Sequence, residues 1–338
     1  MKTLHALRSV IFSLTLSLLI ATTLDAQSSS MENHVNEMFA NARSSSSGLL
    51  SSAKQVVSDG SMVTPFLLDG LQDRQPAEIV WALRCLKNLK DKSSGSVVIQ
   101  LLKHEDETVR SEAILIAKVL YGKKLGSMVF DLTKDKSLSV RRRALDAAIE
   151  LVPHDPRMVD LAFDSLADGD FWLMSRALRV LSKMQVKTPE DKLNLIERSL
   201  KIAPRLNGNV AEMFFAHLSR ALAKDTRVVL ERTLDRGRIG AKVAAFECAG
   251  KLRLREFLPK ARKLIRASNR KIRTAAIRYT GMVKDKDSAS LLIPLLDEFP
   301  PGEMQTAVVI ALRKISGQTI GFDSSKWRAW LNEVIVRR

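Results

Sequence analysis

The chain has 338 residues and a formal net charge of +17, from 54 Lys and Arg residues against 37 Asp and Glu residues. It contains no Gly-rich phosphate loop, no nucleophile elbow and no paired-Cys motif. Its histidines beyond the N-terminal segment show no metal-ligand spacing with another His or Cys; they are His34, His104, His154 and His217. We therefore expect no catalytic residues, no cofactor and no metal site.

The N-terminal segment has the pattern of a secretory signal. Lys2 and Arg8 precede the uncharged, mainly apolar run from Val10 to Leu24, which is shorter than the ~20 residues that span a bilayer. We expect residues 1–26 to be a signal peptide that is cleaved after Ala26, so that the mature chain is exported and has no transmembrane span. An uncleaved signal anchor is the alternative.

Residues 27–60 are rich in serine, a composition that buries little and favours a mobile tether. Within them, Met31 to Arg43 carries Val35, Met38, Phe39 and Ala42 at helical spacing. This part could equally dock as an N-terminal cap.

Residues 61–316 contain an internal repeat. Val109, Ala113, Ile116, Ala117 and Leu120 lie on one face of a predicted helix, and the same offsets return along the chain. The second position of each copy recurs every 30 to 38 residues, and its eight occupants are Ala82, Ala113, Ala144, Ala177, Phe215, Ala245, Ala276 and Val308. A period in this range is typical of a solenoid.

A second apolar helical run precedes each of these helices, so that each repeat is predicted to be a helical hairpin. The clearest runs span residues 97–102, 125–132, 158–166, 193–202, 228–234, 257–265 and 291–296. Alanine at the repeated position, and glycine at Gly250 and Gly281, favour close packing between neighbouring helices. We expect an all-α protein, an α-solenoid of about eight hairpins in one elongated domain.

The segments that begin at Asp106, Ser137 and Asn269 resemble the second helix of the short HEAT repeats of bacterial proteins, the type also found in phycobilisome lyases. The resemblance covers roughly residues 61–316 and implies a binding scaffold. It also implies that one arginine of each repeat makes bonds within and between repeats. Arg110, Arg141 and Arg273 match that position and Lys242 matches in part, whereas Met174 and Gln305 depart from it. We expect this ladder of bonds to be broken in those two repeats.

Residues 317–338 depart from the repeat and resemble the closing segment of many secreted bacterial HEAT-repeat proteins. Trp327 and Trp330 lie three residues apart, on one face of a predicted helix. We interpret them as a cap over the last hairpin, because terminal repeats must cover an otherwise exposed core. An aromatic platform for a ligand is the alternative.

Basic residues concentrate between Lys251 and Arg278, where eleven Lys and Arg residues stand against Glu256 alone. A single-sign patch attracts anionic partners, although a generally basic, solvated surface would give the same composition. The candidate patch consists of Arg253, Arg255, Lys260, Arg262, Lys263, Arg266, Arg270 and Lys271. If the chain is exported, we expect a protein or an anionic glycan or lipid surface as partner rather than nucleic acid. We expect that neutralising Arg262, Lys263, Arg266 and Arg270 weakens binding with little loss of stability.

Cys85 and Cys248 occupy equivalent apolar positions in different repeats. An extended array would hold their Cα atoms further apart than the ~7 Å that a disulfide allows. We therefore expect two small, buried, unpaired side chains.

The leading functional hypothesis is a non-catalytic, exported HEAT-repeat scaffold in a bacterial periplasm or outside the cell. It would bind its partner through a concave helix face and the basic C-terminal half, as a monomer. Two alternatives remain: an accessory subunit or enzyme of the phycobilisome-lyase type, and a structural envelope component that self-associates.

Overall fold

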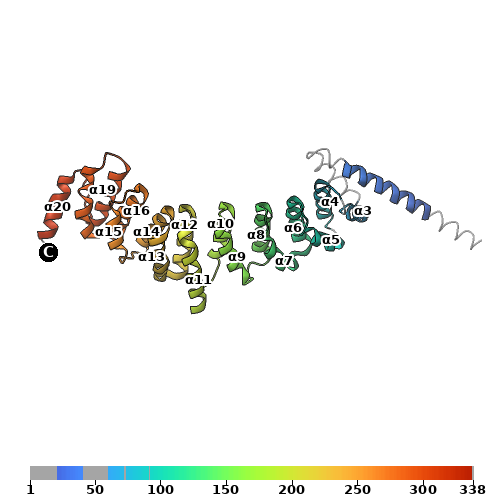
Figure 1. Cartoon of the computed structure of the whole chain (residues 1–338), viewed down its shortest axis with the longest axis horizontal. Coiled ribbons are helices and arrows are strands. Elements are labelled where there is room, and N and C mark those ends of the chain that lie inside the picture. The colour runs from blue at the N-terminus through green and yellow to red at the C-terminus, as the bar shows by residue number, and fades with distance from the viewer. Residues whose placement is uncertain (1–20, 41–59, 72–73, 91, 337–338) are drawn as a thin grey trace, which may run out of the picture. The chain divides into compact units, whose positions relative to one another are not determined.

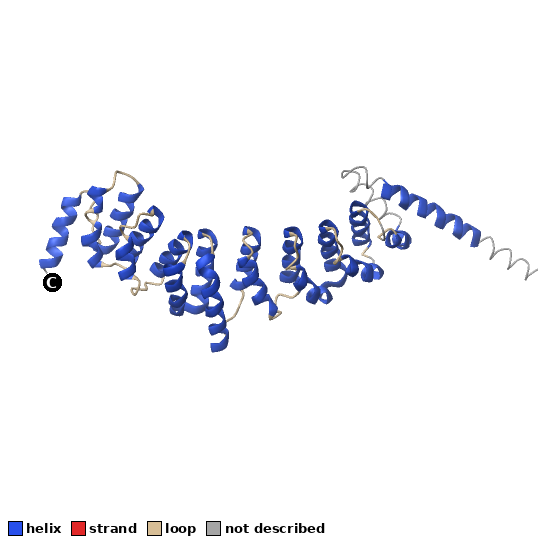
Figure 2. Ribbon diagram, viewed as in Figure 1, coloured by secondary structure: helices blue, strands red, loops and turns tan. Residues whose placement is uncertain are grey.

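The computed structural model describes residues 21–40, 60–71, 74–90 and 92–336 (Figure 1). Within these residues every regular element is a helix and none is a strand (Figure 2). The predicted all-α class is therefore confirmed for the described part of the chain. The core of the expected signal, residues 1–20, lies outside the described residues, as does most of the serine-rich stretch.

Contacts divide the chain into two units, residues 1–155 and residues 156–338. After a helix over residues 21–40, the first unit contains η1 (Gly60–Val63), α3 (Thr64–Asp69), α4 (Pro76–Leu89), η2 (Lys92–Ser94), α5 (Gly95–Leu101), α6 (Glu107–Tyr121), η3 (Gly122–Leu125), α7 (Gly126–Leu132) and α8 (Leu138–Leu151).

The second unit contains the remaining helices. They are α9 (Arg157–Ala167), α10 (Phe171–Ser182), α11 (Pro189–Ile202), η4 (Ala203–Arg205), α12 (Gly208–Leu222), η5 (Ala223–Thr226), α13 (Arg227–Arg236), α14 (Ile239–Lys251), α15 (Leu258–Leu264), α16 (Arg270–Met282), η6 (Lys286–Ser288), α17 (Ala289–Leu292), α18 (Leu295–Glu298), α19 (Glu303–Ser316) and α20 (Ser324–Val336).

Helices pair across short loops, and the second helices of successive pairs pack against one another. In the first unit α5 packs on α6 and α7 on α8, while α4, α6 and α8 contact in sequence. In the second unit α9 packs on α10, α13 on α14 and α15 on α16, while α10, α12, α14, α16 and α19 contact in sequence. Short polar side chains start many second helices: Asp106, for example, accepts hydrogen bonds from the backbone N–H groups of Thr108 and Val109.

The repeated positions form the core, as the spacing predicts. All eight residues at the second position of the repeat have no exposed surface. At Gly281, a Cβ would lie 2.7 Å from the Cα of Ala311, and at Gly250 it would lie 2.7 Å from the sulfur of Met282. Close helix packing therefore explains why glycine occupies these helical positions.

The first helix of the last pair differs from the prediction. The apolar run over residues 291–296 is broken into α17 and α18 at Pro294. Proline lacks a backbone N–H and its ring obstructs the preceding turn, so a continuous helix is disfavoured there.

A terminal helix packs on the core in each of the two units. In the helix over residues 21–40, which runs through Ala26, the side chains of Val35, Met38 and Phe39 are buried. The Phe39 ring lies 4.9 Å from that of Trp81 in α4, edge to face.

At the other end, the Trp327 side chain of α20 is fully buried in the core formed with α19. Its indole N–H donates to the Gly321 carbonyl at 2.8 Å, so this ring is a packing element and offers no face to a ligand. Among the described helices, none combines the length and apolar character that crossing a membrane requires.

Candidate functional site

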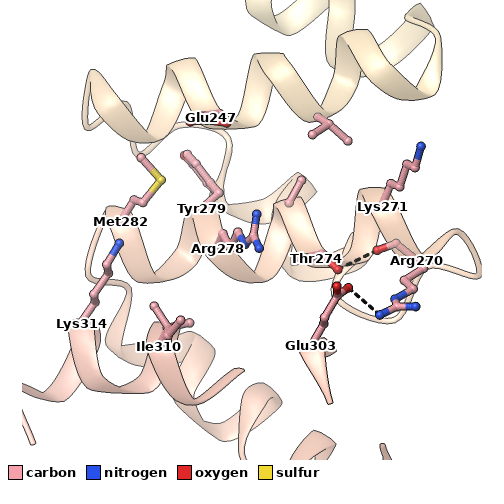
Figure 3. A pocket seen from close by; sticks show the side chains of 13 residues that line it. Glu247, Arg270, Lys271, Thr274, Arg278, Tyr279, Met282, Glu303, Ile310 and Lys314 are labelled. Atoms are coloured by element: carbon pink, nitrogen blue, oxygen red, sulfur yellow. Dashed lines mark hydrogen bonds and ion pairs between the residues drawn. The ribbon is translucent and has the colours of Figure 1, made fainter. Parts of the chain in front are cut away.

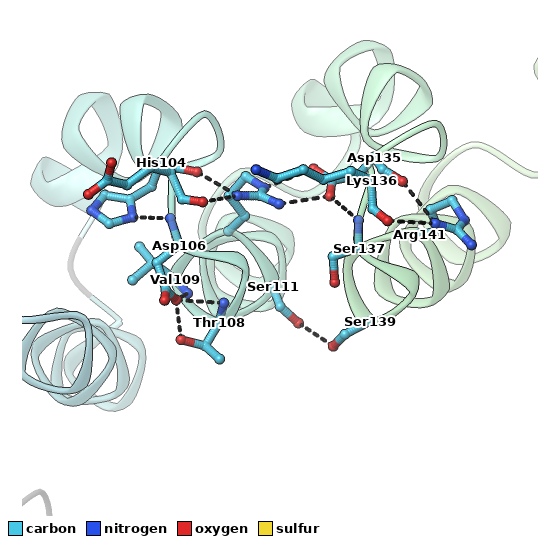
Figure 4. A network of polar contacts seen from close by, with 12 residues as sticks. His104, Asp106, Thr108, Val109, Ser111, Asp135, Lys136, Ser137, Ser139 and Arg141 are labelled. Atoms are coloured by element: carbon cyan, nitrogen blue, oxygen red, sulfur yellow. Dashed lines mark hydrogen bonds and ion pairs between the residues drawn. The ribbon is translucent and has the colours of Figure 1, made fainter.

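The repeat arginines bind backbone carbonyls of the loop that precedes their own helix. Arg110 donates to the carbonyls of His104 and Glu105, both at 2.7 Å, and Arg141 donates to those of Asp135 and Lys136 (Figure 4). In each case the acceptors stand six and five residues before the arginine. The planar guanidinium, with its several donors, closes the loop onto the helix.

Arg110 also links neighbouring helix pairs. Its guanidinium donates to both carboxylate oxygens of Asp135 at 2.8 Å (Figure 4). Burial alone would raise the pKa of Asp135, but the hydrogen bonds from Arg110 and the Ser137 backbone outweigh it, so the pKa lies below its usual value. These contacts give Arg110 a structural role.

The residue at the same position contacts the preceding loop in three further repeats, two of which lack arginine there. Arg273 donates to the Ala267 carbonyl at 3.1 Å, and Lys242 donates to the Asp235 carbonyl at the same distance. Gln305 donates to the carbonyls of Leu296 and Phe299 at 2.7 and 2.9 Å. The expected break at Gln305 is therefore wrong for the contacts within the repeat, because an amide N–H₂ supplies two donors to the loop.

The basic patch is partly compensated by carboxylates that are distant in sequence. Lys260 pairs with Asp235, Arg262 with Asp285 and Asp287, Arg266 with Glu298, and Arg270 with Glu303. Arg255 lies 3.8 Å from the same Asp285. Counting charges along one stretch of chain misses these partners, because neighbouring helix pairs supply them.

Asp285 and Arg262 form the most deeply buried of these pairs. Two guanidinium nitrogens of Arg262 donate to the Asp285 carboxylate at 2.9 and 2.7 Å, and the Asp285 side chain is 2% exposed. Burial would raise the pKa of Asp285, but hydrogen bonds from Arg262 and Ser288 hold it below its usual value. Neutralising Arg262 would leave a buried carboxylate without its main partner, so the expectation that this change leaves stability intact does not fit these contacts.

The patch residues also divide between different elements. Lys260, Arg262 and Lys263 belong to α15, whereas Arg270 and Lys271 belong to α16 and line a groove of about 700 Å³ against α14 and α19 (Figure 3). Arg253 and Lys263 are exposed and lie outside the groove lining. The structure therefore separates the eight predicted residues into at least two surfaces.

Helical spacing places the groove side chains. Lys271, Thr274, Arg278 and Met282 recur every three or four residues on α16 and therefore share the face that lines the groove (Figure 3). The Asn269 side chain caps α16 by accepting from the N–H groups of Lys271 and Ile272, which fixes where the helix begins.

Apolar side chains from three helices form the rest of the groove. Val243 comes from α14, Met282 from α16, and Ile310 from α19, with Ala275 and Ala311 as small lining residues. Ile310 is 44% exposed, so its side chain is accessible to a ligand in the groove. The groove thus offers apolar contact as well as charge.

In the groove, the acidic side chains are paired, whereas three of the basic side chains are not. Its two acids are already engaged, because Glu303 pairs with Arg270 at 2.7 Å and Glu247 pairs with Lys251 at 3.0 Å. Lys271, Arg278 and Lys314 are exposed and have no carboxylate partner within the part of the chain that the structure describes. We call these three residues the groove cations.

The prediction included Lys271 in the patch but not Arg278 or Lys314. Arg278 stands seven residues after Lys271, on the same helix face, and this spacing was the available signal. Lys314 is 43 residues away from Lys271 in sequence, and it joins the groove only because α16 and α19 pack together.

Other candidate chemistry is buried or dispersed. Cys85 and Cys248 are free and buried, as predicted, and burial raises their thiol pKa values to about 12 and about 11. Over the described residues, no cluster of three or more His, Cys, Asp or Glu side chains is placed to hold a metal ion.

No protein-family model matches the chain, and a search of the curated proteins returns no match.

Proposed function

We propose that the chain is a non-catalytic scaffold that binds a protein or another anionic partner through the groove formed by α14, α16 and α19. The observation that carries this proposal is the set of three groove cations beside exposed apolar side chains. An array of paired charges would have little to offer a partner, whereas unpaired cations next to apolar surface supply both electrostatic attraction and contact area.

The architecture that we propose around this groove is a HEAT-like α-solenoid of about eight hairpins. Three observations support it: the recurrence of the repeat every 30 to 38 residues, the loop contacts of Arg110, Arg141 and Arg273, and the sequential packing of second helices within each unit. The N-terminal pattern of Lys2, Arg8 and the apolar run supports export to the bacterial periplasm or beyond as part of the same proposal.

Salt-gradient retention on the immobilised protein tests the binding proposal. A triple variant, Lys271→Gln, Arg278→Gln and Lys314→Gln, removes the groove cations. A matched control, Arg253→Gln, Lys263→Gln and Lys286→Gln, removes the same charge from exposed residues outside the groove lining.

We expect some components of an envelope fraction to elute at high salt from the native protein and from the control. The same components should elute at lower salt from the groove variant. Each lost phosphate-like or carboxylate contact weakens the salt-dependent part of binding. Equal retention by all three proteins would contradict a role for the groove.

A further inference from the structure

The groove cations are arranged along a line. Lys271 and Arg278 are separated by two turns of α16, about 10 Å along the helix axis. Figure 3 shows Arg278 between Lys271 and Lys314, which reaches in from α19. A ligand that satisfies all three cations must carry several negative charges at spacings of this order.

Apolar side chains accompany this line of charge. Val243, Met282 and Ile310 flank it, and Ala275 and Ala311 leave room above the helices because their side chains are small. A purely charged ligand would leave these apolar side chains in water, whereas an apolar group that covers Ile310 gains the free energy of burial.

We propose that the groove binds an acidic peptide segment in an extended conformation, with carboxylates about three residues apart and an apolar side chain between them. Extended chain in the polyproline II form rises about 3.1 Å per residue with three residues per turn, so side chains three apart share one face at about 9 Å spacing. That spacing matches Lys271 and Arg278. This inference rests on the proposed binding function and names the class of its partner.

The engaged acids of the groove support this choice of ligand. Glu303 and Glu247 are paired with Arg270 and Lys251, so they do not compensate the groove cations. The Arg270–Glu303 pair is largely exposed on both sides, and such a pair is weak enough to rearrange when a ligand carboxylate approaches.

Fluorescence anisotropy with a defined peptide tests the proposal. The probe is a labelled peptide that repeats Glu-Leu-Ser, compared with one in which every Glu is replaced by Gln and one in which every Leu is replaced by Ser. We expect both replacements to weaken binding to the native protein. The groove variant loses the three exposed ion pairs between the groove cations and the peptide carboxylates, so it should bind the Glu-Leu-Ser peptide about tenfold or more weakly. The control variant should bind this peptide like the native protein.

A second variant separates the apolar contribution from charge. Ile310→Ser keeps every groove cation, and we expect it to weaken binding of the Glu-Leu-Ser peptide severalfold. Binding of the Glu-Ser-Ser peptide, in which Ser replaces every Leu, should stay unchanged. Thermal unfolding of each variant shows that it is folded before binding is compared.

Other occupants are outcomes of the same test. If polyglutamate without leucine, or vesicles of anionic phospholipid, bind as tightly as the Glu-Leu-Ser peptide, the peptide assignment is overturned in favour of a general anionic surface. If the envelope component is lost in the groove variant while no peptide binds the native protein, the binding function stands and the acidic-peptide inference fails.

Discussion

Replacing Arg262 tests whether the basic region is a binding surface or part of the framework. Its guanidinium makes two hydrogen bonds to Asp285, whose side chain is 2% exposed, while Arg262 itself is 32% exposed. Removing one partner of a fully buried ion pair costs about 3 to 5 kcal/mol. Because Arg262 is partly solvated, we expect Arg262→Gln to cost about 2 to 3 kcal/mol of unfolding free energy.

Arg266 provides a matched control in the same region. It also makes two hydrogen bonds to one carboxylate, that of Glu298, but the two side chains are 58% and 42% exposed. An exposed pair contributes about 0 to 1 kcal/mol, so Arg266→Gln should cost far less than Arg262→Gln. Urea denaturation measures both free energies of unfolding. Amide hydrogen exchange in α15 and α16 shows whether the loss is local, because parts of a protein can open independently of the rest.

The effect of Arg262→Gln should depend on pH. The folded-state pKa of Asp285 is depressed, so its contribution to stability is fully present above the usual Asp pKa of about 3.9 and is lost as pH falls through the lower folded-state pKa. The difference between native protein and Arg262→Gln should therefore be constant near neutrality and shrink below about pH 4. Equal costs for the two arginine variants, or a difference that grows in acid, would refute the framework role of Arg262.

Two further changes test the packing and the loop contacts. Gly281→Ala should destabilise the protein by about 1 kcal/mol or more, because overpacking against Ala311 outweighs the gain in helix propensity. Thermal unfolding measures this, with Gly208→Ala as the control, because a Cβ at Gly208 would come no closer than 3.5 Å to a neighbour. If Gly281→Ala stabilised the protein, the helices would be able to move apart. Gln305→Leu should cost about 1 kcal/mol through two lost hydrogen bonds, whereas Gln305→Arg should restore stability in the same assay, and equal stability of the two variants would contradict the assigned contacts.

Local periodicity was enough to predict the helical class and the core of the repeats. The eight repeated positions were identified from offsets alone, and all eight are fully buried. This works because the side chains of a helix repeat every ~3.6 residues, so a buried face leaves the same spacing in every copy. Gly281 is a similar case, since glycine inside a helix indicates that a neighbour approaches closely.

The tertiary structure decided which charges are available to a partner. Arg262, Arg266 and Lys271 look alike in sequence, within one strongly basic stretch. The first has a buried carboxylate partner, the second an exposed one, and the third none among the described residues. The partners stand 23 and 32 residues away, on elements that helix packing brings alongside.

Part of the candidate groove could be predicted from the sequence, and part depends on helix packing. The spacing of Lys271 and Arg278 on one helix face could be obtained from the sequence, because it is a property of a single helix. The addition of Lys314 and Ile310 depends on how α19 packs against α16. Electrostatic interactions act through space, so a count of charges along the chain determines net charge, whereas only the packed structure determines which cations are compensated.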